Sequence, residues 1–506
     1  MFVRRKKNKS GSESVQIISK SKGKYEVVKT IGSSFEAGEI DSLVEKGEQE
    51  ILRIKEQPGL FILEKDKLVE NFLTSLENGQ VRTVGPELVF GKIYDYIGFK
   101  KLRSDLFRHL VIARLAFPLS KLKTIEYLNR FQGIRLEIDT VYRFLDKLSG
   151  GLKEEVERIS FEHTKKVLKG NISIVFYDLT TLYFESSDED DLRKTGFSKD
   201  GKHSNPQIYL GLLVGFGGYA IGYDIFEGSI YEGQRLIPMI EKMSLKFDLS
   251  KPIIVADAGL LNAKNILGLE EKGYQYILGA RIKNESKDIK DKILETNFKN
   301  TEYIVLEKET SKLVVQYSEK RAKKDENNRE RGLKRLEKQI KSGKLSKQNL
   351  NNRGYNKYLK MKGDIRLEID LDKLKQDKKW DGLKGYVTNC HLPATEIMDN
   401  YRNLWQIEKA FRMSKTDLRI RPIYHRLKRR IEAHICVSFT AYAVYKELER
   451  VLKEANFELS VEKAAEITHN MYQLEITLPQ SRHSKTILLK MDKNQSKLIQ
   501  IIDQNF

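Results

Sequence analysis

The sequence predicts a multidomain α/β protein built around a mixed β-sheet. The chain has 506 residues, which is too many for one hydrophobic core and favours roughly three or four domains. Between about residues 170 and 280, short β-rich runs alternate with segments of helical periodicity. The regions before and after this stretch repeat apolar residues at threefold and fourfold spacing, which is typical of helices.

The N-terminal third is predicted to contain a small hairpin followed by helices. Residues 1–35 combine a basic arm with two β-rich runs, and residues 36–57 carry apolar side chains at helical spacing. Residues 91–168 have a helical pattern throughout, and lysine and arginine crowd its first part. A basic helical module suits contact with duplex DNA, whereas a structural helical domain with a solvated face has the same pattern. Both interpretations stay open.

Three β-rich runs open the central region. The first, Ile172–Asp178, ends in an acid. The next two, Ile208–Phe216 and Tyr219–Phe226, are joined at Gly217-Gly218, which is a hairpin signal. These runs predict three consecutive strands, the last two of them antiparallel.

Two helices and two more strands complete the central region. Glu232–Phe247 has helical spacing, and Pro252–Asp257 is a fourth strand that again ends in an acid. Asn262 is a suitable N-cap for a helix that ends at Gly273, and Tyr276–Gly279 is a fifth strand.

The resulting order, β-β-β-α-β-α-β, is that of the ribonuclease H-like fold. A right-handed crossover through the first helix makes the fourth strand parallel to its neighbour. The first and fourth strands lie side by side in this fold. We therefore expect Asp178 and Asp257 at the same edge of a mixed five-stranded sheet.

A long interruption separates these strands from the last acidic element. Residues 284–385 begin with short strands, and Lys320–Lys347 then hold twelve Lys or Arg against four Asp or Glu. The periodicity of this segment predicts a helix. Its basic composition favours a helix that lies along DNA, although a solvated helix has the same composition. Strand-like Lys384–Thr388 leads back to the core.

The chain from Pro393 to Lys415 is predicted to form one helix. Positions seven apart lie within about 20° of each other around a helix, so Tyr401, Glu408 and Lys415 share one face. Arg412 lies close to that face. An acid flanked by a hydroxyl group and two cations suits a site that holds a metal ion and phosphate. A solvated helix with ordinary charge pairs is the other interpretation.

Three acids are predicted to form a metal site: Asp178, Asp257 and Glu408. Carboxylates that converge without His or Cys suit a hard cation such as Mg²⁺ or Mn²⁺. Two such ions roughly 3.5–4 Å apart activate a water or a 3′-hydroxyl and stabilise the leaving oxygen in phosphoryl transfer. Either aspartate alone is also a common turn former at a strand end, so the prediction depends on all three acids together.

Charge and composition favour a DNA partner and a cytoplasmic protein. The chain has 91 Lys and Arg against 71 Asp and Glu, a net charge of +20. This favours a polyanion such as nucleic acid, although a lysine-rich proteome or a ribosome-associated protein gives a similar total. Two cysteines, Cys390 and Cys436, do not make a disulfide framework. The uncharged run Ile208–Tyr223, which Gly217-Gly218 interrupts, is shorter than the ~20 residues that span a bilayer, so we expect no membrane segment.

Three short motifs resemble those of a known family. Tyr401, Glu408 and Lys415 match the helix signature Tyr-x2-Arg-x3-Glu-x6-Lys in register. Tyr177–Thr181 and Val255–Gly259 resemble the motifs around the first and second acids. On these residues the chain resembles a DDE-type bacterial insertion-sequence transposase.

The resemblance, which extends over about residues 170 to 445, implies cut-and-paste transposition. Two protomers, a homodimer on paired ends, would hydrolyse one strand at the terminal inverted repeats and join the freed 3′-hydroxyl to target DNA. The three acids would hold the metal ions, and Tyr401 and Lys415 would contact phosphate near the scissile bond.

One position departs from the signature, because Leu404 occupies the place of its arginine. We expect Arg412, which is better oriented toward Glu408 than Arg402 is, to supply the missing cation. Some relatives release the element through a hairpin, with an aromatic side chain stacked on a flipped base. Trp380 is the candidate for that role, and a core tryptophan is the other interpretation.

Two other functions fit the same residues. A nuclease or resolvase of the same fold would cut without joining. A non-catalytic DNA-binding protein derived from a transposase would bind without cutting, although all three acids are present here. The predicted domains are a basic arm with a small hairpin and helix (1–90), a helical, DNA-binding region (91–168), the two parts of the ribonuclease H-like core (169–283 and 386–450), a basic insertion (284–385) and a C-terminal helical region (451–506).

Overall fold

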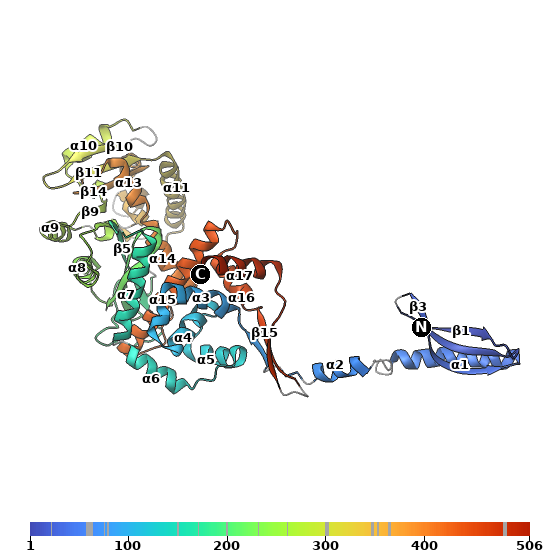
Figure 1. Cartoon of the computed structure of the whole chain (residues 1–506). Coiled ribbons are helices and arrows are strands. Elements are labelled where there is room, and N and C mark those ends of the chain that lie inside the picture. The colour runs from blue at the N-terminus through green and yellow to red at the C-terminus, as the bar shows by residue number, and fades with distance from the viewer. Residues whose placement is uncertain are drawn as a thin grey trace. The chain divides into compact units, whose positions relative to one another are not determined.

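A computed structural model shows the chain as two compact units (Figure 1). The first comprises Met1–Val81 and Leu474–Ile487, and the second comprises Arg82–Gln473 and Leu488–Phe506. The structure describes all residues except 22, 57–63, 75, 78–79, 149–150, 171, 199–200, 231, 261, 299–302, 346–348, 352–353, 363–365 and 479–482.

The first unit contains an antiparallel three-stranded sheet. Its strands β1 (Phe2–Lys7), β2 (Glu13–Ser21) and β3 (Lys24–Ser34) pair in that order. Helix α1 (Ala37–Glu56) packs on the sheet, and isoleucines from β2 and α1 form a small buried core. The sequence predicts only a hairpin here, because the cations of β1 obscure its strand character. Charged side chains are common on edge strands, where they discourage further pairing.

A long buried helix organises the helical part of the second unit. Helix α15 (Lys428–Glu454) is buried along most of its length and contacts five other helices of this part. The hydroxyl groups of Ser104 and Ser120 accept backbone hydrogen bonds and cap two of the helices. The helices of this part are α3 (Lys92–Ile97), α4 (Asp105–Ala116), α5 (Lys121–Tyr127), α6 (Ile138–Leu148), α7 (Gly151–Val167) and α17 (Lys493–Asn505).

The second unit also contains one large mixed sheet. Five of its strands are β5 (Ile174–Tyr183), β6 (Gln207–Val214), β7 (Ala220–Glu227), β8 (Ile253–Ala256) and β9 (Tyr276–Ala280). They lie in the order β7-β6-β5-β8-β9, with β5, β8 and β9 parallel and the other neighbours antiparallel. This is the strand order of the ribonuclease H-like fold, so the predicted core is confirmed.

Three further strands extend the sheet beyond β9. They are β10 (Tyr303–Glu307), β11 (Lys312–Tyr317) and β14 (Leu383–Thr388), and the order continues as β9-β14-β11-β10. The sheet therefore has eight strands where the sequence predicts five. The difference arises because the insertion begins and ends on the sheet itself. Helix α11 (Glu319–Lys341) lies between β11 and β14 in the chain.

Helices cover both faces of this sheet. On one face, α8 (Leu236–Phe247) shares a core with the odd-numbered residues Val175 and Tyr177 of β5. On the other face, the even-numbered residues Ile174 and Phe176 share a core with α15. Because successive residues of a strand point to opposite faces, the residue after Tyr177 projects toward the α15 side.

The C-terminal region, predicted as helical over 451–506, is mixed. Strands β15 (Tyr472–Thr477) and β16 (Ser484–Leu488) lie between α16 (Val461–Thr468) and α17. The alternation in β15 spans only six residues, too few to stand out against the helical pattern on either side.

The remaining elements are short. In the part of the chain that the structure describes, no helix has the length and apolar character needed to cross a bilayer. The remaining short elements are α2 (Glu64–Thr74), β4 (Val81–Thr83), α9 (Ala263–Glu271), α10 (Lys287–Glu295), β12 (Leu359–Lys362), β13 (Arg366–Ile369) and α12 (Leu371–Lys378).

Candidate active site

Two of the predicted acids lie next to each other where β8 ends beside β5, a place termed the acidic edge. Asp178 lies within β5, which continues to Tyr183, so the prediction that this strand ends at the acid is wrong. Strands β5 and β8 are parallel, with Tyr177 opposite Ala256, so Asp178 and Asp257 occupy the next position along each backbone. Paired strands are roughly 5 Å apart. The residues two positions before each aspartate belong to the core on the α15 side, so both aspartates project toward that face.

The third acid, Glu408, lies on a helix that packs on the same face. Helix α14 (Trp405–Thr416) contacts β5 and β6, and its residues Ile407, Ala410 and Phe411 are buried in the α15-side core. Glu408 itself is exposed. Its charge, like that of Asp257, acts on the phenol of Tyr401, so Glu408 lies within electrostatic range of the residue that contacts the second acid.

The chain around Tyr401 and Glu408 forms two helices, so the prediction of one continuous helix is wrong. Helix α13 (Ala394–Arg402) ends before α14 begins, and Asn403 and Leu404 lie between them. Here backbone N–H groups donate to carbonyls three residues earlier, as in a 3₁₀ turn. The side-chain amide of Asn403 also donates to a backbone carbonyl of α13 (3.0 Å), which competes with regular helix geometry.

The hydroxyl group of Tyr401 holds Asp257. It donates to Asp257 Oδ1 at 3.0 Å, and Tyr401 is only 4% exposed. Burial raises the pKa of Tyr401, and the negative charges of Asp257 and Glu408 raise this pKa further. The phenol of Tyr401 therefore stays protonated and donates its hydrogen bond to Asp257. Its pKa responds to the charges of both Asp257 and Glu408.

Gly279 of β9 makes room for this contact. A Cβ atom at this position would lie 2.3 Å from the hydroxyl oxygen of Tyr401 and 2.9 Å from the backbone nitrogen of Ala258. Both distances are shorter than van der Waals contact. Any larger residue at Gly279 would displace Tyr401 from Asp257.

Lys384 of β14 is a functional candidate that sequence reasoning missed. Its ammonium group lies 4.5 Å from the centroid of the Tyr401 ring. Burial and the charge of Arg321 lower the pKa of Lys384, whereas Asp257 and Glu408 act in the opposite direction. The ammonium group of Lys384 is therefore close enough to interact electrostatically with both carboxylates. No spacing marks it in the sequence, because the insertion separates it from the strands beside it.

The two cations predicted on α14 differ in their surroundings. Lys415 is half-buried and lies seven residues after Glu408 in the same helix, so these two side chains share a face. Arg412 is exposed and lines a groove of about 420 Å³ with Lys409 and Glu449. That groove contains none of the three predicted acids.

The donor atoms of the three acids fit a hard divalent cation. Asp178 is half-buried, with its Oδ1 accepting the N–H of Leu179 at 2.8 Å, while Asp257 and Glu408 are exposed. Carboxylate oxygens without sulfur or nitrogen are the ligands that Mg²⁺ and Mn²⁺ prefer. Across the described residues, no three His, Cys, Asp or Glu side chains are drawn together closely enough to form a finished metal site.

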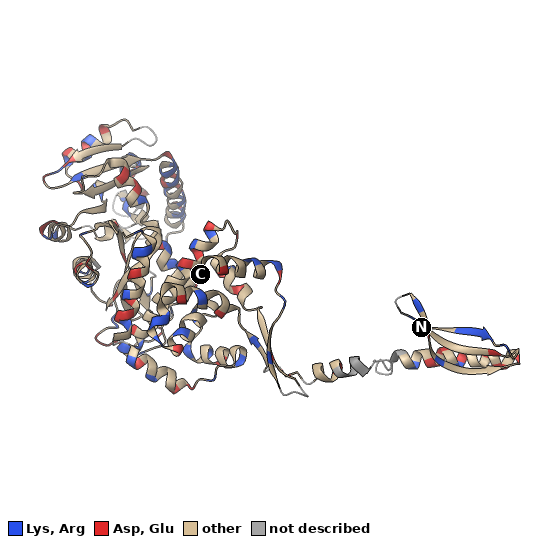
Figure 2. Cartoon of the chain, viewed as in Figure 1, with Lys and Arg blue, Asp and Glu red and all other residues tan. Residues whose placement is uncertain are grey.

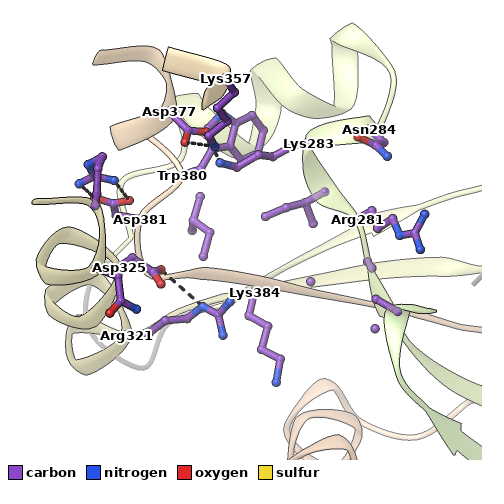
Figure 3. Close-up of a pocket in the computed structure, with 18 of the residues that line it drawn as sticks. Arg281, Lys283, Asn284, Arg321, Asp325, Lys357, Asp377, Trp380, Asp381 and Lys384 are labelled. Carbon is purple, nitrogen blue, oxygen red and sulfur yellow. Dashed lines mark hydrogen bonds and ion pairs between the residues drawn. The ribbon is translucent and has the colours of Figure 1, made fainter. Parts of the chain in front are cut away.

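A cavity of about 760 Å³, the active-site cavity, runs from Asp257 and Tyr401 into the insertion. Residues of β9, β14 and α11 form its walls, together with the segment Gly354–Tyr358. Figure 3 shows Trp380 beside Lys357 and Asp377 at one side of this cavity. The cations that line it are Arg281, Lys283, Arg321, Arg329, Lys357 and Lys384.

Acids of the insertion neutralise most of these cations. The ion pairs are Arg329 with Asp381, Lys283 and Lys357 with Asp377, and Arg321 with Asp325. Arg281 and Lys384 have no such partner among the residues that the structure describes (Figure 3). Their charges remain available to an anionic ligand that enters the cavity.

Comparison with known proteins identifies a family for this region. The model of the family described as transposase DDE domain matches residues 169–444, which is more than half of the chain. No curated protein matches the chain. Among solved structures, the cryo-EM structure of a piggyBac transposase synaptic complex with hairpin DNA is similar, with a TM-score of 0.37 and 10% identity over 76% of this chain and 78% of that one.

Proposed function

The chain belongs to the transposase DDE-domain family, and on that premise we propose that it performs cut-and-paste transposition of DNA. In this proposal it binds the terminal inverted repeats of an element and cleaves the DNA with a divalent metal. It then joins the freed 3′-hydroxyl to target DNA. In this proposal Asp178, Asp257 and Glu408 hold a pair of divalent ions, Mg²⁺ or Mn²⁺.

The parallel register of β5 and β8 is the observation that carries this proposal. It supports a shared metal site because it puts Asp178 beside Asp257 under the helix that bears Glu408. Bound metal ions would supply an activated water or 3′-hydroxyl and stabilise the leaving oxygen. The hydroxyl of Tyr401 orients the Asp257 carboxylate, which keeps this ligand in place as DNA enters.

Cations around the acids are proposed to hold the phosphates of the scissile strand. Lys415 shares the helix face of Glu408. Lys384 lies over the Tyr401 ring, within electrostatic range of Asp257 and Glu408. The signature arginine is replaced by Leu404, and Arg412 is one candidate for its role. The position of Lys384 favours it over Arg412, because Arg412 lines a separate groove.

The distribution of charge supports DNA as the substrate. The net charge is +20, and α11 contains ten Lys or Arg against five Asp or Glu. Figure 2 shows these basic residues along the helix.

We propose that α11 lies along DNA, and that two protomers pair the ends of the element as a homodimer. Trp380, half-buried in the active-site cavity, is the candidate to stack on a base flipped from a hairpin end.

The proposal is tested with the full chain, Mg²⁺ and duplexes that carry the inverted repeats bracketing the gene. We expect cleavage at the repeat ends and joined strand-transfer products from the wild type. Asp257→Asn keeps an oxygen that accepts from Tyr401 but removes the charge, so we expect it to fold and to lose both products. Cleavage without joining would instead indicate a nuclease or resolvase. No products from either protein, with DNA binding intact, would indicate a binding protein. Equal products from wild type and Asp257→Asn would contradict the role of Asp257 as a metal ligand.

A further inference from the structure

Outside the active-site cavity, basic residues line a second cavity of about 530 Å³, the cationic pocket. Lys123, Arg419 and Arg421 belong to this lining, and so do four further basic residues. They are Arg114 of α4, Lys121 of α5, His434 of α15 and His425 in the segment before α15. The side chains of Arg114, Lys121 and His434 are each 5% exposed. Among the described residues, no Asp or Glu lines the pocket.

Neutral groups supply the hydrogen bonds of the buried cations. Arg114 Nη1 donates to the carbonyls of Leu418 and Arg419 at 3.5 and 3.4 Å, which are long distances for such bonds. Lys121 Nζ lies 3.4 Å from His434 Nδ1. These contacts orient the side chains but leave their positive charge without a counterion in the described part of the protein.

Burial without a counterion is unfavourable for these groups. Burial lowers the pKa of Arg114 to about 10, and burial together with the charge of Arg114 lowers the pKa of Lys121. Asp146 acts electrostatically on His425, but Arg429 and Arg430 already bind its carboxylate at 2.8 and 2.7 Å. An anion bound in the pocket would reduce the unfavourable free energy of burying these cations without a counterion.

The pocket is open to ligands of modest size. Tyr424, 70% exposed, and Leu122, 54% exposed, stand on its rim. The hydroxyl groups of Ser120 and Tyr142 belong to residues of the same lining. Within the described chain Arg114 donates through Nη1, so Nε and Nη2 are left to contact a ligand.

We propose that the cationic pocket binds a phosphate group. An arginine fork, a lysine and hydroxyl groups in one partly enclosed cavity match the charge and the several acceptor oxygens of phosphate. The group is carried either by a DNA backbone or by free inorganic phosphate. The inference that this phosphate belongs to DNA rests on the proposed function. In that case the pocket gives the transposase a phosphate contact away from the acids.

The first test uses inorganic phosphate and thermal unfolding of the full chain. We expect phosphate to raise the midpoint for the wild type more than chloride does at equal ionic strength. Lys121→Met is expected to lose this response, while its midpoint without phosphate equals or exceeds that of the wild type because a buried charge is gone. Lys147→Met, at an exposed position of α6 outside the pocket, is the matched control and should respond like the wild type. Lys121→Arg keeps the charge and should also respond.

The second test identifies the source of the phosphate by duplex binding at several salt concentrations. If DNA enters the pocket, Lys121→Met binds about tenfold more weakly and with a salt slope smaller by about one. A phosphate response with unchanged DNA binding assigns the pocket to free phosphate. No phosphate response in the wild type, together with unchanged DNA binding by Lys121→Met, overturns the proposal. The phosphate response is independent of cleavage, so it stands or falls separately from transposition.

Discussion

The acidic edge of the sheet and the cationic pocket hold charge in opposite ways. At the edge, Asp257 and Glu408 are exposed, so water solvates their carboxylates before any ligand arrives. In the pocket, Arg114 and Lys121 are almost fully buried and have no acid beside them in the described structure. Loss of hydration makes such buried charges unfavourable in the folded protein.

This difference separates activity from stability. Removing an exposed acid should change what the protein does and leave its unfolding free energy nearly the same. Replacing a buried, uncompensated cation by an apolar side chain of similar size should leave the fold as stable or make it more stable, and weaken binding. The two sites therefore predict mutational signatures of opposite kind.

The largest expected effect is that of Glu408→Gln. Loss of the third carboxylate removes a metal ligand, and we expect strand transfer to fall by at least about a thousandfold, or about 4 kcal/mol. Because Glu408 is exposed, the unfolding free energy should change by no more than about 0.5 kcal/mol. Single-turnover strand transfer and thermal unfolding of the same preparation measure both quantities.

Lys409→Gln, next to Glu408 and bound to Glu449, is the matched control for Glu408→Gln. It should retain strand transfer within a few-fold. If Glu408→Gln stays active while Asp257→Asn does not, Glu408 is no metal ligand, and the edge would need another third acid.

A smaller effect is expected for the cation beside the acids. Lys384→Ala should lower strand transfer by about thirtyfold, or about 2 kcal/mol, because it removes a charge-assisted contact to phosphate. Arg412→Ala should have a much weaker effect, since Arg412 lines a different groove. Parallel rate measurements on both variants compare them directly. The reverse ranking would assign the role of the missing signature arginine to Arg412, as the helix spacing alone suggests.

The sheet could be predicted from sequence because each of its signals is local. Ile172–Asp178 and Pro252–Asp257 read as strands that end in an acid, and the element order then fixes their neighbours. Hairpin chemistry at Gly217-Gly218 likewise depends on adjacent residues. The extension of the sheet by β10, β11 and β14 was not predictable, because nothing local tells an inserted strand which edge it joins.

The site was predictable only in part, for the same physical reason. Glu408 stands out through its spacing within one helix, but Asn403 and Leu404 divide that helix, and no Gly or Pro announces the break. Lys384 reaches Tyr401 only after the insertion has folded. The cationic pocket combines α4, α5 and α15, so its residues are distant in the chain and carry no motif.

The smallest expected effect concerns acid and the cationic pocket. Burial and the charges of Lys121, Arg430 and Arg114 lower the pKa of His425 from 6.5 to about 3, while Asp146 opposes this shift. The unfolded chain therefore binds a proton between pH 6.5 and 3 that the folded chain does not. Stability from this group is present above pH 6.5 and is lost as the pH falls. His425→Gln lacks the titration, so its stability relative to the wild type should improve by about 1–2 kcal/mol from pH 7 to pH 5.

Denaturant unfolding at both pH values, with and without inorganic phosphate, measures this difference and connects it to the pocket. Bound phosphate places a negative charge near the imidazole of His425 and favours its protonated form. It should therefore reduce the stability that the wild type loses between pH 7 and pH 5. The same phosphate should change His425→Gln less between the two pH values. An acid response that is identical in both proteins would mean that His425 is already solvated, and the contrast between a hydrated acidic edge and a dehydrated cationic pocket would then rest on Arg114 and Lys121 alone.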